Sequence, residues 1–190
     1  GVTGVMPDAR IDAIGASGNI SGDAGGLGVE KAWQLQTLLF DDVLIKTMKY
    51  LVANETNPDN LRVINISLGY NFLALDLLSD EELESLGEVK RHIGSQATLI
   101  RDLAQSFEDD VLFVVAAGND SDGREKPLEA KWANPFAWAA KHEWLSGDPV
   151  RNIIVVEAAD RDGKRASFSN TGGDVAAPGV DIMSTLATGK

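Results

Sequence analysis

The sequence contains no cysteine and only two histidines, His92 and His142. Without cysteine the chain cannot form disulfides, an all-cysteine zinc site or a thiol nucleophile. His142-Glu143 is not followed by the second histidine of a metalloprotease helix, and Asp160-Arg161-Asp162-Gly163 lacks the further ligands of a calcium loop, which favours a simple turn. We therefore interpret both histidines as structural or surface residues, and we expect neither a metal nor a cofactor.

Basic residues and long apolar runs are also scarce. The chain has 17 lysines and arginines against 29 aspartates and glutamates, a net charge of −12, and no basic cluster that could replace phosphate counterions. No apolar run approaches the roughly 18–20 residues of a membrane span, and the start has no signal-peptide pattern. We expect no nucleic-acid partner and no membrane insertion. With 44% hydrophobic and 24% charged residues, the composition is typical of a globular domain.

A glycine-rich segment, residues 15–28, lies between an expected strand and an expected helix, where phosphate-binding loops occur. It lacks the third glycine of a dinucleotide fingerprint. The nearest approach to a P-loop runs from Gly118 to Gly123, but Arg124 and Glu125 stand where that motif needs a lysine and a hydroxyl. We interpret the segment as a plain loop and keep a Rossmann-like nucleotide-binding domain only as an alternative.

The most apolar segment, residues 111–115, is followed by Ala-Ala-Gly-Asn. A continuous apolar run predicts a strand covered on both faces, and the small residues predict a tight turn that other groups can approach closely. Residues 121–150 are polar, rich in tryptophan and interrupted by proline, which predicts a long connection with one short helix. The remaining patterns predict strands at 9–16, 62–67 and 152–158, short extended pieces at 165–170 and 174–179, and helices at 29–53, from Ser79 to a break at Gly94, and at 97–107.

Strands that alternate with helices predict an α/β fold with a mostly parallel sheet and helices on both faces. In such a sheet the ends of neighbouring strands meet at one edge, where ligands bind. Ser67-Leu68-Gly69 and Gly118-Asn119 follow two of the predicted strands. We expect them to emerge together and to mark the functional site.

Five segments, in the right order, resemble successive motifs of the subtilisin-like serine proteases. They are Gly-Val-Met-Pro-Asp-Ala at 4–9, Val-Ile-Asn-Ile-Ser-Leu-Gly at 63–69, Val-Val-Ala-Ala-Gly-Asn at 114–119, Arg-Ala-Ser-Phe-Ser-Asn at 165–170 and Asp-Val-Ala-Ala-Pro-Gly-Val at 174–180. The resemblance implies a subtilisin-like three-layer sandwich that is incomplete, with residues 1–190 as one partial domain. Residues 70–93 and 121–150 are longer than in compact members, so we expect insertions there.

The resemblance also implies roles for individual residues. Asn119 matches the asparagine whose side chain stabilises the oxyanion of the tetrahedral intermediate. A neutral amide donor suits this role. The alternative is that Asn119 only shapes a turn. Ser67-Leu68-Gly69 would bind an extended substrate peptide as an added strand. Ala116-Ala117-Gly118 would form one wall of the pocket for the residue before the cut bond, and Asn134-Pro135 its floor.

A serine protease of this kind needs a serine, a histidine and an aspartate. The family carries its aspartate and histidine before the first of these motifs and its serine after the last, so the resemblance implies that all three lie outside this chain. We therefore expect the middle portion of an endopeptidase that acts on peptides or proteins and is inactive as given, with a pseudo-protease scaffold as the alternative. The absence of cysteine leaves both the cytosol and the exterior open as compartments, and only the resemblance points to a secreted or cell-surface protein. The missing core helix would expose apolar surface and favour self-association.

Overall fold

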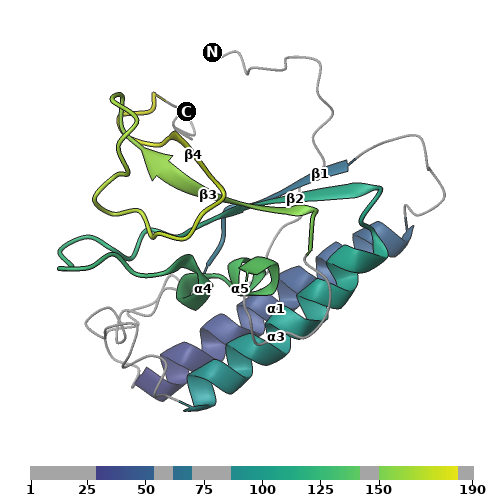
Figure 1. Cartoon of the computed structure of the whole chain (residues 1–190). Helices are drawn as coiled ribbons and strands as arrows, with labels where there is room; N and C mark the ends of the chain where they lie inside the picture. The colour runs from purple at the N-terminus through teal and green to yellow at the C-terminus, as the bar shows by residue number, and fades with distance from the viewer. Residues whose placement is uncertain (1–28, 54–61, 70–86, 142–149, 184–190) are drawn as a thin grey trace, which may run out of the picture.

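The computed structural model describes residues 29–53, 62–69, 87–141 and 150–183. The predicted strand at 9–16, the glycine-rich loop, the helix start at Ser79 and His142 lie outside these residues. Figure 1 shows the described elements, which are α1 (Val29–Ala53), β1 (Arg62–Ile66), α3 (Gly87–Ser106), β2 (Val111–Ala116), α4 (Ala130–Ala133), α5 (Pro135–Lys141), β3 (Ile153–Ala159) and β4 (Val175–Pro178).

The four strands form a single parallel sheet in the order β1-β2-β3-β4. Ile64 pairs with Phe113 and Val115 pairs with Val155, so the central strands are in register over their apolar residues. Strand β1 connects to β2 through α3, and β2 connects to β3 through α4 and α5. Parallel neighbours joined by helices confirm the predicted α/β class.

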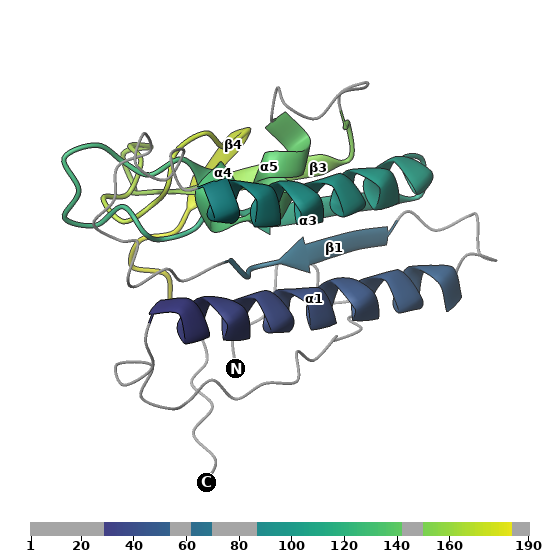
Figure 2. The same cartoon turned by 90° about the horizontal axis from the view of Figure 1, so that it is seen from below.

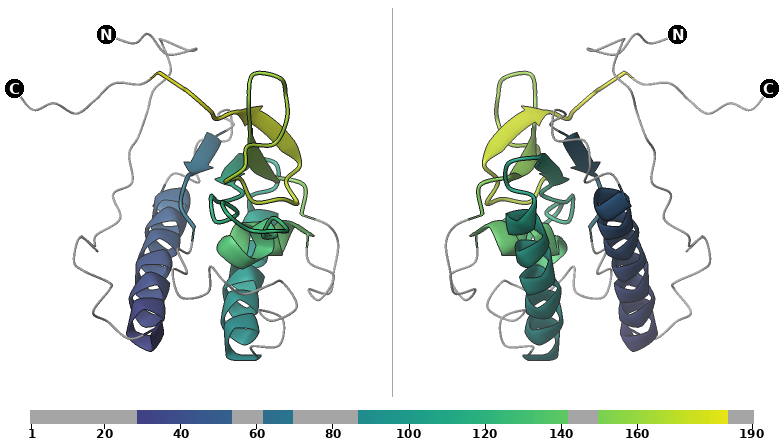
Figure 3. Two further views of the ribbon diagram at one scale, coloured as in Figure 1. Left: turned by 90° about the vertical axis from the view of Figure 1, so that its left-hand side faces the viewer. Right: turned by 90° about the vertical axis from the view of Figure 1, so that its right-hand side faces the viewer.

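Helices α1, α3 and α5 lie on the same side of the sheet (Figures 1 and 3). Phe136 on α5 joins the layers, since its ring centroid lies 6.2 Å from that of Phe40 on α1 and 5.7 Å from that of Phe113 on β2. Along β2 buried residues alternate with half-buried ones such as Leu112 and Val114, whereas the sequence predicted full cover on both faces. The described residues supply a sheet and one helical layer, and contain no helix of the second predicted layer.

The predicted break at Gly94 is wrong, because α3 runs without interruption from Gly87 to Ser106. A glycine inside a helix costs about 1 kcal/mol relative to alanine. Ile93, Ala97 and Ile100 are completely buried on one face of α3, and this packing outweighs the cost. Figure 2 shows α1 and α3 side by side, and Gln96 Nε2 on α3 donates a hydrogen bond to Asp41 Oδ1 on α1 at 2.6 Å.

The described part of residues 121–150 is not the polar connection that the sequence predicted. It contains two short helices instead of one, and Trp132 and Trp138 are buried and pack edge to face with ring centroids 5.1 Å apart. Charged residues such as Lys131 and Lys141 are more exposed than these rings. The described charged residues of this segment therefore lie on its outer face, while its described aromatic and alanine residues belong to the core.

The turn predicted at residues 160–163 is confirmed. The Asp160 carboxylate accepts hydrogen bonds from the backbone N–H groups of Asp162 and Lys164, both at 2.9 Å, and Gly163 has a positive φ of 77°. The acidic side chain stabilises its own turn in this arrangement. Among the described helices, none is both long enough and apolar enough to span a bilayer.

Candidate functional site

The carboxyl ends of β1 and β2 bring the predicted site residues to one edge of the sheet. The two strands are parallel, and Ile66 of β1 pairs with Val115 of β2. Residues 67–69 follow β1, and residues 116–119 form the end of β2 and the turn after it. The predicted meeting of these two segments is confirmed.

Asn134, between α4 and α5, fixes the two strand ends relative to each other. Its buried side-chain Nδ2 donates hydrogen bonds to Leu68 O at 3.2 Å and to Ala116 O at 3.0 Å. Its Oδ1 accepts a hydrogen bond from Phe136 N at 2.9 Å, which makes Asn134 the N-cap of α5, with Pro135 in the first helical position. One side chain therefore sets both the spacing of the strands and the start of the helix.

Two glycines at this edge are required by close neighbours. A Cβ on Gly69 would lie 2.7 Å from Ala133 O at the end of α4. Gly118 has a φ of +101°, and a Cβ there would lie 2.4 Å from Asn170 Nδ2 and 2.9 Å from Asp120 Oδ2. A side chain at Gly118 would be strained by the backbone conformation and would also collide with polar groups.

Asn170, which ends the fourth of the matching motifs, bonds to the turn around Asn119. Its side-chain Nδ2 donates to Ala117 O at 3.0 Å and to Asp120 Oδ2 at 2.8 Å, and its Oδ1 accepts from Asp120 N at 3.0 Å and from Ser121 Oγ at 2.8 Å. Its own backbone N–H donates to Gly118 O at 3.0 Å. Both side-chain groups of this fully buried residue are thus satisfied by one short turn.

The Asn119 side chain differs from the groups that surround it. It is exposed, and within the described part of the chain it has no hydrogen-bond partner. Its amide can donate to an oxygen outside the turn without changing its own charge. Ser67, at the neighbouring strand end, is also exposed and accepts a hydrogen bond from Asn65 Nδ2 at 3.0 Å.

The described residues contain no group of three or more side chains that could hold a metal ion. Of the two histidines, only His92 on α3 is described. Burial lowers the pKa of His92 below its ordinary value, and the charge of Asp41 on α1 opposes this effect. This arrangement is typical of a structural histidine that is mostly neutral at pH 7.

Sequence reasoning missed the two asparagines that hold the site together. The resemblance assigns Asn134 only to a pocket floor, together with Pro135, although an asparagine directly before a proline and an apolar helix is a recognisable N-cap signal. For Asn170 no local signal exists, because Asp120 lies 50 positions away in the sequence.

One comparison with known proteins, the match to a family model, agrees with the order of the motifs in this chain. A model described as the subtilase family matches residues 1–190, which is the whole chain. A search of the curated proteins gave no match. The order of the motifs, the parallel sheet and the meeting of the two strand ends are features expected of this family of serine proteases. This chain therefore belongs to the subtilase family.

Proposed function

We propose that this chain is the middle portion of a subtilisin-like serine endopeptidase, in which Asn119 stabilises the oxyanion of the tetrahedral intermediate. The observation that carries the proposal is the exposed Asn119 amide without a partner among the described residues, on a turn whose neighbouring groups are hydrogen-bonded. A fixed donor of this kind acts on charge that develops during the reaction, and little reorganisation is needed.

We also propose that the neighbouring strand ends bind the substrate peptide. Strand β1 lies at an edge of the described sheet, and its continuation at Ser67-Leu68-Gly69 offers backbone groups to an added strand. Ala116-Ala117-Gly118 would form the wall against the side chain before the cut bond. The hydrogen bonds from Asn134 to Leu68 O and Ala116 O support this assignment, because they hold the two walls at a fixed separation.

The chain alone should not hydrolyse peptides by the family mechanism. That mechanism needs a serine, a histidine and an aspartate in mutual reach. His92 and His142 are the only histidines in the sequence, and neither lies in one of the five matching motifs. We propose that the catalytic residues belong to parts of a longer protein outside residues 1–190.

A fluorophosphonate probe, which labels activated serines covalently, tests the proposal. We expect the full-length product that contains this chain to be labelled, and the 190-residue chain to remain unlabelled. Labelling of the short chain would contradict the proposed inactivity. A full-length product without labelling would identify a pseudo-protease scaffold instead.

Substitution of Asn119 tests the assigned role. In the full-length product, Asn119→Ala is expected to lower kcat by about 10²–10³-fold with little change in KM, a magnitude known from subtilisin itself. Thr98→Ala, at an exposed position on α3, is the control and should leave both constants unchanged. If Asn119→Ala leaves kcat unchanged, Asn119 only shapes the turn.

We further propose that the 190-residue chain self-associates through α1. Ile45, Met48 and Val52 are exposed and lie on one stripe of this helix, with spacings of three and four residues. Sedimentation velocity should show species larger than a monomer as concentration rises. Replacing the three side chains by glutamine should restore the monomer, and a strictly monomeric parent chain at high concentration would contradict the proposal.

A further inference from the structure

The peptide groups on both sides of Asn119 are held by one residue. The peptide plane between Gly118 and Asn119 carries Gly118 O, which accepts a hydrogen bond from Asn170 N at 3.0 Å. The plane between Asn119 and Asp120 carries Asp120 N, which donates to Asn170 Oδ1 at 3.0 Å. Because each peptide group is planar, fixing these two planes fixes the backbone conformation of Asn119.

Further hydrogen bonds of the Asn170 side chain hold the residues before and after Asn119. Its Nδ2 bonds to Ala117 O before the turn and to the Asp120 carboxylate after it. Its Oδ1 also accepts a hydrogen bond from Ser121 Oγ, which in turn accepts one from Leu128 N at 2.9 Å. The turn is thereby tied to the segment that leads into α4.

None of these hydrogen bonds uses the amide of Asn119. The backbone that carries the Asn119 side chain is therefore fixed, while the amide N–H groups of that side chain remain available to a ligand. We propose that Asn170 is a positioning residue for the reaction: it sets the direction of the Asn119 amide toward the oxyanion without contacting the substrate. This inference rests on the oxyanion role proposed above for Asn119.

The geometry requires an asparagine at this position. One end of the side chain must donate, because Ala117 O and the Asp120 carboxylate only accept. The other end must accept, because Asp120 N and Ser121 Oγ donate to it. An aspartate would place its oxygens against two acceptors, and a shorter side chain would not span the turn.

A double-mutant cycle in the full-length product tests the inference. We expect Asn170→Ala to lower kcat by about tenfold to 10²-fold with little change in KM, because a displaced donor loses part of its effect. In an Asn119→Ala background, Asn170→Ala should lower kcat no further, since the group that it positions is already absent. Asp120→Ala, which removes only one of the contacts, should lower kcat less and provides a second variant if Asn170→Ala fails to fold.

Asn152→Ala is the matched control, because Asn152 is also buried and also bonds to backbone carbonyls, but at the other end of β2. It should reduce stability and leave kcat unchanged. Amide hydrogen exchange of the 190-residue chain gives an independent readout: Asn170→Ala should accelerate exchange at Asp120 much more than at Val115.

The outcomes separate the two proposals. If Asn119→Ala lowers kcat and Asn170→Ala lowers it by the same factor in both backgrounds, the positioning role is wrong while the oxyanion role stands. An effect of Asn170→Ala on KM alone would also overturn the positioning role. If Asn119→Ala has no effect on kcat, the oxyanion role itself fails.

Discussion

The two ends of strand β2 are both held by buried asparagines that lie far away in the sequence. At the amino end, Asn152 Nδ2 donates to Ala104 O at 2.8 Å and to Val111 O at 2.9 Å, joining the end of α3 to the start of the strand. At the carboxyl end, Asn134 and Asn170 donate to the carbonyl oxygens of consecutive residues, Ala116 and Ala117. Each amide satisfies buried carbonyl groups that would otherwise be costly.

The ends differ in what they leave exposed. At the amino end, Phe107 and Val111 are buried, and the bonds close the core. At the carboxyl end, the chain turns through a glycine with positive φ and presents Asn119 to solvent. The same kind of hydrogen bond thus seals one end of the strand and orients a side chain at the other.

Gly118→Ala should have the largest effect and would break the carboxyl end alone. We expect the free energy of unfolding to fall by about 3 kcal/mol, because the positive φ is unfavourable for alanine and its Cβ would collide with Asn170 Nδ2. Urea denaturation measures this change. Gly123→Ala is the matched control, since Gly123 also has positive φ but has open space around it, and it should cost only about 1 kcal/mol. Equal losses would show that crowding by Asn170 is unimportant.

Asn152→Ala should break the amino end and leave the carboxyl end intact. The carbonyl groups of Ala104 and Val111 would lose a buried donor, so we expect a loss of about 2 kcal/mol in the free energy of unfolding. Urea denaturation measures the loss. The amide of Asp120 should remain as protected from hydrogen exchange, relative to the global stability of each variant, as it is in the parent chain. Selective exposure of Asp120 would mean that the two ends are not independent.

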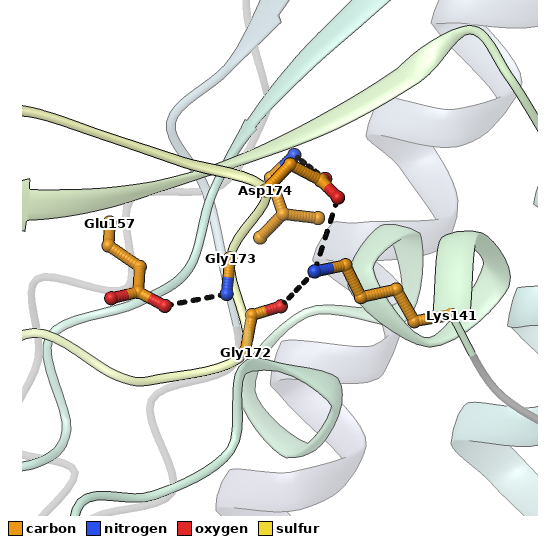
Figure 4. Close-up of polar contacts among 6 residues, drawn as sticks. Lys141, Glu157, Gly172, Gly173 and Asp174 are labelled. Carbon is orange, nitrogen blue, oxygen red and sulfur yellow. Dashed lines mark hydrogen bonds and ion pairs between the residues drawn. The ribbon is translucent and has the colours of Figure 1, made fainter.

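Replacing Lys141 on α5 tests whether a partly exposed ion pair stabilises the fold as much as the buried asparagine hydrogen bonds do. Lys141 Nζ lies 2.5 Å from Gly172 O and 3.2 Å from Asp174 Oδ1, while Glu157 Oε1 accepts a hydrogen bond from Gly173 N (Figure 4). Both charged side chains of the ion pair are 38% exposed, so Lys141→Met should lower the free energy of unfolding by less than about 1 kcal/mol. The loss should shrink further in high salt. A loss as large as that of Asn152→Ala would remove the distinction between exposed and buried links.

His92 lies on α3, the helix that leads into the amino end of β2. Replacing it should have the smallest effect on the free energy of unfolding. Burial lowers its pKa from the ordinary 6.5, so the unfolded state binds the proton more readily. As pH falls below about 6.5 and through the folded-state pKa, the free energy of unfolding should therefore decrease. His92→Gln should make stability less dependent on pH between about 7 and 5. An unchanged pH profile would show that other groups cause the dependence.

Local patterns predicted most of the described elements. Helix α1 has the predicted bounds, and β1, β2 and β3 match the predicted strands within one or two residues. Apolar periodicity and strand-ending small residues depend only on neighbouring positions, so a single sequence reveals them. The meeting of the two strand ends then followed from parallel pairing.

The sequence could not predict what depends on distant contacts. Gly94 is tolerated because α3 packs along its whole length, and Trp132 and Trp138 are buried because two short helices turn them inward. The hydrogen bonds from the asparagine side chains to the strand ends join residues that are 18 to 66 positions apart. For the candidate site, the resemblance supplied the residues at the strand ends, but the groups that hold them emerged only from the fold.

The three asparagines also have a fixed place in the order of synthesis. Asn134, Asn152 and Asn170 each follow, in the chain, the carbonyl groups to which they donate. Synthesis proceeds from the amino terminus, so β2 leaves the ribosome before any of the three asparagines that bond to its ends. The hydrogen bonds from Asn170 to the turn that carries Asn119 can form only after residue 170 has emerged from the ribosome, so this turn depends on a part of the chain that is synthesised late.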